Sequence, residues 1–167
     1  MEETKGNYAF IDSQNLNLGI QRLGWRLDFR RFRVYLQEKY RVSKAYLFIG
    51  YLPGNQNLYR ALQEYGYILI FKPVLERQGG MKGNIDAELV LHAMIEYANY
   101  DQTIIVTSDG DFACLVEYLY GRRKLAMVLS PTVTTCSILL RRAAREKIVY
   151  MDNLEQRLAY NKRGGTA

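Results

Sequence analysis

The chain has 167 residues, 49% of them hydrophobic and 24% charged, which fits one folded domain and excludes a disordered or fibrous protein. No apolar run approaches the roughly 18 residues that a membrane-spanning helix needs, and the first ten residues lack a secretion-signal pattern. We therefore expect a single domain over residues 1–160, a disordered tail over 161–167, no membrane association and a cytoplasmic location. The oligomeric state stays open, and a homo-oligomer is possible.

The charge balance favours a polyanionic partner. The 23 lysines and arginines exceed the 17 acidic residues and give a net charge of +6. Three clusters contribute most: Arg30, Arg31 and Arg33; Arg122, Arg123 and Lys124; and Arg141, Arg142, Arg145 and Lys147. A basic surface suits nucleic acid, because neutralised phosphates release their counterions. Any single cluster is better explained as a solvated helix face, so only their sum carries weight.

Apolar runs rich in β-branched residues alternate with helical patterns along the chain. Strands are predicted over residues 8–11, 45–51, 67–71, 103–107, 125–129 and 148–151. Helices are predicted from the Asp28 cap to residue 40 and over 57–64, 85–99, 112–120, 137–144 and 154–158. Residues 76–83, ERQGGMKG, read as a mobile loop. This order predicts an α/β fold, a three-layer α/β/α sandwich with a mostly parallel central sheet.

Aspartates follow two of the predicted strands. Asp12 comes directly after the first strand, and Asp109 and Asp111 follow the strand over 103–107. Ligands bind at the carboxyl ends of the strands in such sheets, so these carboxylates should meet at one edge. Asp12 alone is also explained by a turn that leaves the strand, and Asp109 or Asp111 by a helix cap beside Gly110. One aspartate would suffice as a cap, so the second favours a site.

Asp86 is placed by helical geometry. In the helix over 85–99 the polar residues Glu88, His92, Glu96 and Asn99 recur at helical spacing and are predicted to form a solvated stripe. Asp86 lies about 200° from Glu88, on the side of Leu89 and Ala93. It either caps this helix or faces a partner across a cleft.

Four converging carboxylates would repel one another unless a cation lies among them. Oxygen ligands favour Mg²⁺ or Mn²⁺ over zinc, and the spacing of Cys114 and Cys136 argues against a structural zinc site. We expect Asp12, Asp86, Asp109 and Asp111 to be both the metal ligands and the catalytic residues, with water activated by the metal as the nucleophile. Without these four the rest of the chain carries +10 instead of +6.

Other residues are assigned supporting roles. Ser13, Asn15 and Ser108 are expected to orient a carboxylate or a bound water, although a local turn explains Ser13 and Asn15 equally well. Lys82 is a candidate phosphate contact or an ordinary solvated lysine. His92 is a poor general base because it lies on the polar stripe. The substrate-binding candidates are Lys82, Arg122, Arg123, Arg141 and Arg142.

Three motifs together resemble a known family. FIDSQN at 10–15, KGNIDAEL at 82–89 and VTSDGDF at 106–112 are similar to the NYN branch of the PIN-like nucleases, within it the LabA-like proteins. The resemblance covers about residues 8–158. It implies a PIN-like fold, metal-dependent phosphodiester hydrolysis, usually of RNA, and metal-directed roles for Asp12, Asp86, Asp109 and Asp111. Ser13 stands where many relatives have glycine, and Arg145 stands near a position that is acidic in some.

We therefore expect a metal-dependent, ribonuclease-type phosphodiesterase that acts on RNA rather than DNA. The alternative is a catalytically silent RNA-binding adaptor with the same fold. A D-x-D phosphatase is disfavoured because Gln14 stands two residues after Asp12, and a Toprim-like domain because the first strand lacks glutamate. The sequence has no GxxxxGK[ST] or GxGxxG loop, which argues against nucleotide triphosphate or dinucleotide chemistry.

Overall fold

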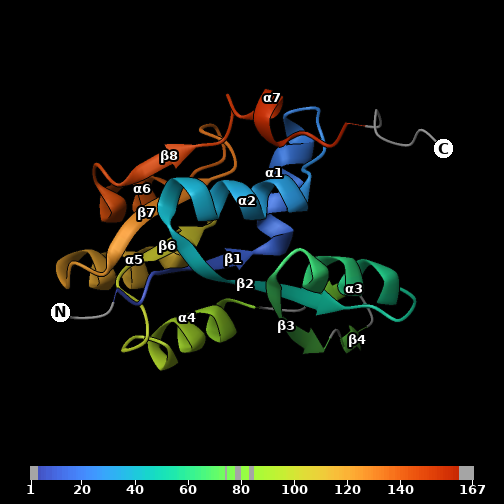
Figure 1. Ribbon diagram of the computed structural model, residues 1–167, viewed down its shortest axis with the longest axis horizontal. Coiled ribbons are helices and arrows are strands. Elements are labelled where there is room, and N and C mark those ends of the chain that lie inside the picture. The colour runs from blue at the N-terminus through green and yellow to red at the C-terminus, as the bar shows by residue number, and fades with distance from the viewer. Residues whose placement is uncertain (1–3, 74, 78–79, 83–84, 162–167) are drawn as a thin grey trace.

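Strands and helices alternate along the chain in a computed structural model (Figure 1). The structure describes residues 4–73, 75–77, 80–82 and 85–161, with the backbone alone given for 73, 75–77 and 80–82. The strands are β1 (Asn7–Asp12), β2 (Val42–Tyr51), β3 (Tyr67–Pro73), β4 (Leu75–Arg77), β5 (Gly80–Lys82), β6 (Thr103–Val106), β7 (Leu125–Ser130) and β8 (Ile148–Tyr150). The helices are α1 (Ser13–Arg22), α2 (Phe29–Tyr40), α3 (Gln56–Glu64), α4 (Asp86–Ile95), the short 3-10 helix η1 (Gly110–Phe112), α5 (Ala113–Gly121), α6 (Ile138–Ala144) and α7 (Glu155–Leu158).

Six strands form one sheet in the order β3-β2-β1-β6-β7-β8, and every neighbouring pair is parallel. The predicted parallel sheet is thus confirmed. Ile11 of β1 pairs with Leu47 of β2 and Val106 of β6. The carboxyl ends of β1 and β6 therefore finish level with each other, which places Asp12 beside the residues that follow β6.

Two apolar layers cover the sheet. On one face Leu16 of α1, Leu36 of α2 and Leu158 of α7 pack against the sheet. On the other face Leu89 of α4, Val116 of α5 and Leu140 of α6 do so. Figure 1 shows α2 and α4 on opposite sides of the strands, which confirms the three-layer sandwich. None of these helices, in the part of the chain described, is long and apolar enough to cross a bilayer.

Local structure differs from the sequence-based prediction at two places. Residues 13–22 form α1, which was not predicted. Residues 75–82 contain the antiparallel pair β4 and β5, with Leu75 opposite Lys82, where a mobile loop was expected. Residues 78, 79 and 83 of that loop, and residues 162–167 of the expected tail, lie outside the described part of the chain.

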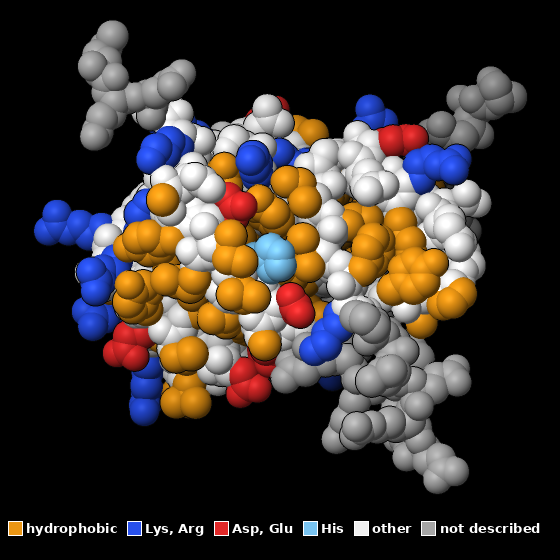
Figure 2. Space-filling view, turned by 90° about the horizontal axis from the view of Figure 1, so that it is seen from below, with side chains coloured by type: hydrophobic (Ala, Val, Ile, Leu, Met, Phe, Trp, Pro, Cys, Tyr) orange, Lys and Arg blue, Asp and Glu red, His pale blue; other side chains and the backbone are white. Residues whose placement is uncertain are grey.

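The outward face of α4 also corrects the sequence analysis. Of the predicted solvated stripe, Glu88, His92 and Glu96 are half-buried and only Asn99 is exposed. The ring of His92 packs edge-on against Phe48, with centroids 5.5 Å apart. The helix itself ends at Ile95, before Glu96 and Asn99. The exposed positions are apolar instead, with Leu91 53% and Ile95 60% exposed. Figure 2 shows this face, with apolar side chains surrounding the single histidine. Leu89 and Ala93 are buried as expected.

Candidate functional site

Three aspartates form a carboxylate cluster at the carboxyl edge of the sheet. Asp86 begins α4, Asp109 caps η1 and Asp111 lies within η1. One carboxylate oxygen from each lies within 4.8 Å of the other two. The start of α4 and the turn after β6 therefore present oxygen ligands to one point.

The turn after β6 is fixed by its own hydrogen bonds. The amide of Asp111 donates to Oδ1 of Asp109 (2.9 Å), and the amide of Asp109 donates to Oγ1 of Thr107 (3.2 Å). Phe112 anchors the turn in the core. A Cβ on Gly110 would lie 2.4 Å from Oγ of Ser137, so glycine lets η1 pack closely against the segment before α6. Both carboxylates are thus held at the sheet edge by backbone geometry.

Asp12 lies beside the cluster, but its carboxylate is not among the three whose oxygens converge. It is 6% exposed, and its carboxylate accepts from the amide of Asn15 (3.3 Å) and from Oγ1 of Thr107 (3.3 Å). Burial raises the pKa of Asp12 to about 6, with further increases from the charges of Asp86 and Asp109. Asp12 therefore caps α1 and adds negative charge directly behind the cluster.

Two of the three residues expected to orient the site, Asn15 and Ser108, are hydrogen-bonded to each other beside it. Oδ1 of Asn15 accepts from the amide (2.8 Å) and the hydroxyl (3.0 Å) of Ser108, and the carbonyl of Ser108 accepts from the amide of Ser137 (3.0 Å). Ser13 is the buried first residue of α1. Thr107 was missed by sequence reasoning, although it links Asp12 to Asp109. A threonine at the end of a strand gives no local signal of such a role.

The cluster has the electrostatics of a cation site. Burial raises the pKa of Asp86, and the charges of Asp109 and Asp111 raise it further, while Lys72 opposes them. Three clustered carboxylates that offer oxygen donors alone fit a hard divalent cation such as Mg²⁺ or Mn²⁺. Lys72, at the end of β3, is a cation near the cluster that the sequence analysis missed. The side chain of Lys82 lies outside what the structure describes.

Arg122 and Arg123 are not brought to the cluster. The carbonyl of Lys124 accepts from the amide of Thr103 (2.7 Å), the first residue of β6, and the carbonyl of Arg123 accepts from Gln102 (3.3 Å). These residues therefore lie at the amino end of β6, whereas Asp109 follows its carboxyl end. These arginines lie far from Asp109 because α5 connects two parallel strands. The helix carries the chain from the carboxyl end of β6 back to the amino end of β7.

Several other basic residues have structural roles. The guanidinium of the buried Arg33 donates to the carbonyls of Gly66, Val42 and Ser43, and Lys124 donates to those of Tyr97 and Tyr100. Arg141 donates to the carbonyl of Val133, while Arg142 is exposed on the same helix. Arg145 ends α6 and lies 4.7 Å above the ring of Tyr120, at the end of α5 remote from η1. Arg145 therefore lies away from the carboxylate cluster and does not stand at a metal-ligand position.

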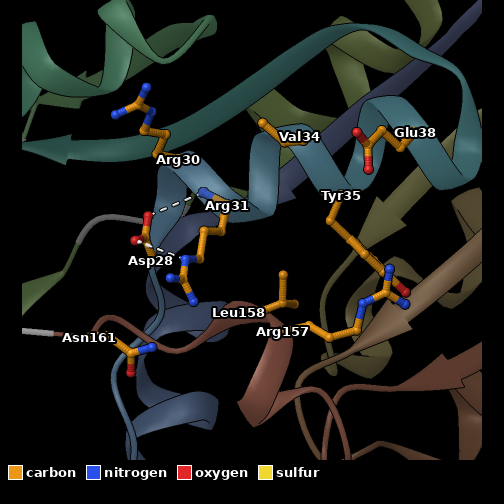
Figure 3. A pocket seen from close by; sticks show the side chains of 9 residues that line it. All are labelled: Asp28, Arg30, Arg31, Val34, Tyr35, Glu38, Arg157, Leu158 and Asn161. Carbon is orange, nitrogen blue, oxygen red and sulfur yellow. Dashed lines mark hydrogen bonds and ion pairs between the residues drawn. The ribbon is translucent and has the colours of Figure 1, made fainter. Parts of the chain in front are cut away.

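Arg30 and Arg31 of the first basic cluster border a separate hollow between α2 and α7. Figure 3 shows that hollow, with Arg31 turned toward Asp28, the cap of α2, and Arg157 lying by Tyr35. The Arg31 nitrogen Nε lies 3.8 Å from the Asp28 carboxylate. None of the cluster aspartates lines this hollow. The positive charge of Arg31 is thus partly neutralised by Asp28.

Another arginine does lie beside the cluster. Arg22, in the last turn of α1, lines a hollow together with Asp109 and Asp111. A basic residue at the end of the helix that follows Asp12 would have been the signal for it. The sequence analysis did not predict that helix.

A parallel α/β sandwich with carboxylates gathered at its carboxyl edge has the architecture of a nuclease-like domain. The NYN domain family model matches residues 8–152, which is most of the chain, and the chain belongs to this family. The protein is 29% identical over 132 residues to the low amplitude and bright protein LabA of Synechococcus elongatus, covering 72% of this chain and 71% of that protein. A crystal structure of a protein of unknown function from Vibrio parahaemolyticus, VPA0982, has the same fold. It matches with a TM-score of 0.78 at 24% identity, over 95% of this chain and 99% of that one.

Proposed function

We propose that this protein is a metal-dependent nuclease that hydrolyses phosphodiester bonds in RNA. The observation that carries the proposal is the convergence of Asp86, Asp109 and Asp111 at the carboxyl edge of a parallel sheet. Membership of the NYN domain family supports nucleic acid as the substrate class. The net charge of +6 is consistent with a polyanionic substrate.

The three aspartates of the cluster would hold Mg²⁺ or Mn²⁺, and the buried Asp12 would increase the negative potential at the cation from behind. A bound divalent cation supplies Lewis acidity, which activates water and stabilises the charge that develops on the phosphate. Lys72 is a cation near Asp86, and its charge partly offsets the increase in the pKa of Asp86. It is therefore a candidate contact for a phosphate oxygen.

His92 has no part in this proposal. Its Nδ1 lies 2.9 Å from the carbonyl of Glu88, and its ring packs against Phe48. A general base must reach the proton that it removes. The imidazole is instead held in the interface between α4 and the sheet.

The Asp109→Asn variant tests the catalytic assignment. Asparagine caps a helix about as well as aspartate, so the turn should be preserved while one strong metal ligand is lost. We expect wild type to cleave single-stranded RNA with Mn²⁺ and to gain melting temperature from Mn²⁺, and the variant to do much less of both. The metal-free variant should be at least as stable as wild type, because one repelling charge is removed.

Asp28→Asn is the matched control. Asp28 caps α2 through the amide of Arg31 (3.1 Å), just as Asp109 caps η1, but it lies outside the cluster. This control should cleave RNA like wild type. Equal cleavage by the Asp109→Asn variant would contradict the catalytic role of the cluster. RNA binding without cleavage by wild type, in either metal, would instead indicate an RNA-binding adaptor.

A further inference from the structure

The hollow that contains Arg22 adjoins the carboxylate cluster, and we call it the side hollow. It has a volume of about 470 Å³. Its walls come from α1, from the turn after β6 and from the segment before α6, and the lining includes Asn15, Arg22, Asp109, Asp111, Ser137 and Leu139. Because Asp109 and Asp111 belong to both, a ligand bound at the cluster would continue directly into the side hollow.

One end of the side hollow carries hydrogen-bond donors. Arg22 is exposed, and among the described residues no carboxylate lies within ion-pair distance of it. Oδ1 of Asn15 is occupied by two bonds from Ser108, one of them from an amide, so the side-chain amide must present Nδ2 as its donor. Oγ of Ser137 accepts from the amide of Leu139 (3.2 Å), which leaves its hydroxyl hydrogen for another acceptor. These donors favour an anion.

The side hollow also has an apolar part that is open to solvent. Leu139 lines it and is 57% exposed, and the neighbouring Ile138 is exposed as well. A hollow lined by both an exposed leucine and an exposed arginine suits a ligand that has both an anionic group and an apolar surface. A nucleotide has both, in its phosphate and in its base.

We infer that the side hollow binds the nucleotide next to the scissile bond, with Arg22 and Asn15 contacting its phosphate and Leu139 contacting its base or ribose. This inference rests on the proposed function and adds to it a second phosphate contact. The carboxylate cluster repels a bare phosphate, whereas the donors of the side hollow attract one. A strand that spans both places would therefore be held in one position relative to the cluster.

The test compares Arg22→Ala with Arg60→Ala, a matched exposed arginine in the middle of α3 that does not line the side hollow. Both variants place alanine, the best helix former, in a helix, so both should melt like wild type. Each is combined with Asp109→Asn, and binding of a short single-stranded RNA is measured by fluorescence anisotropy in chelator. We expect Arg22→Ala to weaken binding about tenfold, the loss expected for one charge-assisted hydrogen bond, and Arg60→Ala to leave it unchanged.

A second measurement uses cleavage of a trinucleotide whose non-scissile linkage is either a phosphodiester or an uncharged methylphosphonate. Neutralising that linkage should lower kcat/KM of wild type about tenfold and should have little effect on Arg22→Ala, which has already lost the contact. Arg22→Lys should keep part of the sensitivity. Equal sensitivity of wild type and Arg22→Ala would overturn the inference.

The two arms separate the inference from the proposed function. If wild type cleaves no RNA, the nuclease proposal fails, while the anisotropy measurement still tests the side hollow. The side hollow is not a nucleotide site if adding Arg22→Ala to the Asp109→Asn protein leaves RNA binding unchanged. The same conclusion follows if Arg60→Ala weakens binding as much as Arg22→Ala does. Both conclusions hold whatever the outcome for cleavage.

Discussion

Asp12 shows at the scale of one residue how structural and chemical roles combine. Its carboxylate caps α1 and accepts from Thr107, both of which stabilise the charged form. Burial outweighs these bonds and raises its pKa to about 6. The metal-free protein therefore holds a carboxylate that ionises at a higher pH than an ordinary aspartate, and a divalent cation beside it would favour the ionised form.

This pKa predicts how stability depends on pH without metal. The folded-state pKa lies above the unfolded value of about 3.9, so the stabilising contribution of Asp12 is complete below pH 4 and is lost as pH rises through 6. The shift of two units corresponds to a loss of about 3 kcal/mol by pH 8. Melting in chelator at several pH values checks this, and Asp12→Asn, which can still cap α1, should show a smaller loss between pH 4 and 7. Parallel curves for the two proteins would contradict the shifted pKa.

At the scale of elements, α1 shows why part of the site escaped prediction. Its sequence, SQNLNLGIQR, contains Gly19, which lowers intrinsic helix propensity by about 1 kcal/mol relative to alanine. The structure explains this glycine, because a Cβ there would lie 2.4 Å from Cβ of Pro131. The contact joins residues far apart in the sequence, so local propensity could not reveal it. Arg22 and its hollow were missed with the helix.

The contact between η1 and the segment before α6 makes a second element-scale prediction. Gly110→Ala would place a methyl group 2.4 Å from Oγ of Ser137 and should destabilise the fold by about 1–3 kcal/mol. Ser137→Gly removes the obstructing atoms and should cost only a few tenths of a kcal/mol as a cap. Urea unfolding of both single variants and the double variant checks this. The double variant should be more stable than Gly110→Ala alone, and a purely additive result would show that the clash is relieved elsewhere.

At the scale of the whole molecule, the sequence predicted the sheet and the edge where the carboxylates meet. Buried parallel strands are nearly continuous in apolar residues, and the carboxyl-edge rule depends on topology alone, so both could be obtained without an alignment. The surface charge was harder to predict. Arg33 and Lys124 read as surface cations in the sequence, yet both donate to backbone carbonyls, and only the folded chain brings those acceptors to them.

The remaining basic residues predict a salt-dependent affinity for RNA. If about three phosphates are contacted, the logarithm of the association constant should fall with a slope of about −2 against the logarithm of salt concentration. Affinity should then drop about fifteenfold between 50 and 200 mM salt. Anisotropy of the Asp109→Asn variant in chelator measures this without cleavage. Affinity that stays flat over that range would contradict a phosphate-directed interface.

Ser108 links the three segments that form the walls of the side hollow, through Asn15 of α1 on one side and the amide of Ser137 on the other. Ordering a loop residue costs about 1–2 kcal/mol of conformational entropy. In the folded chain the hydrogen bonds of Ser108 already hold this turn, so that entropy is lost on folding and not on cation binding. Binding of a cation would then require little rearrangement of the turn after β6. The free energy that a cation relieves would be the electrostatic repulsion among fixed carboxylates, because the turn is already ordered.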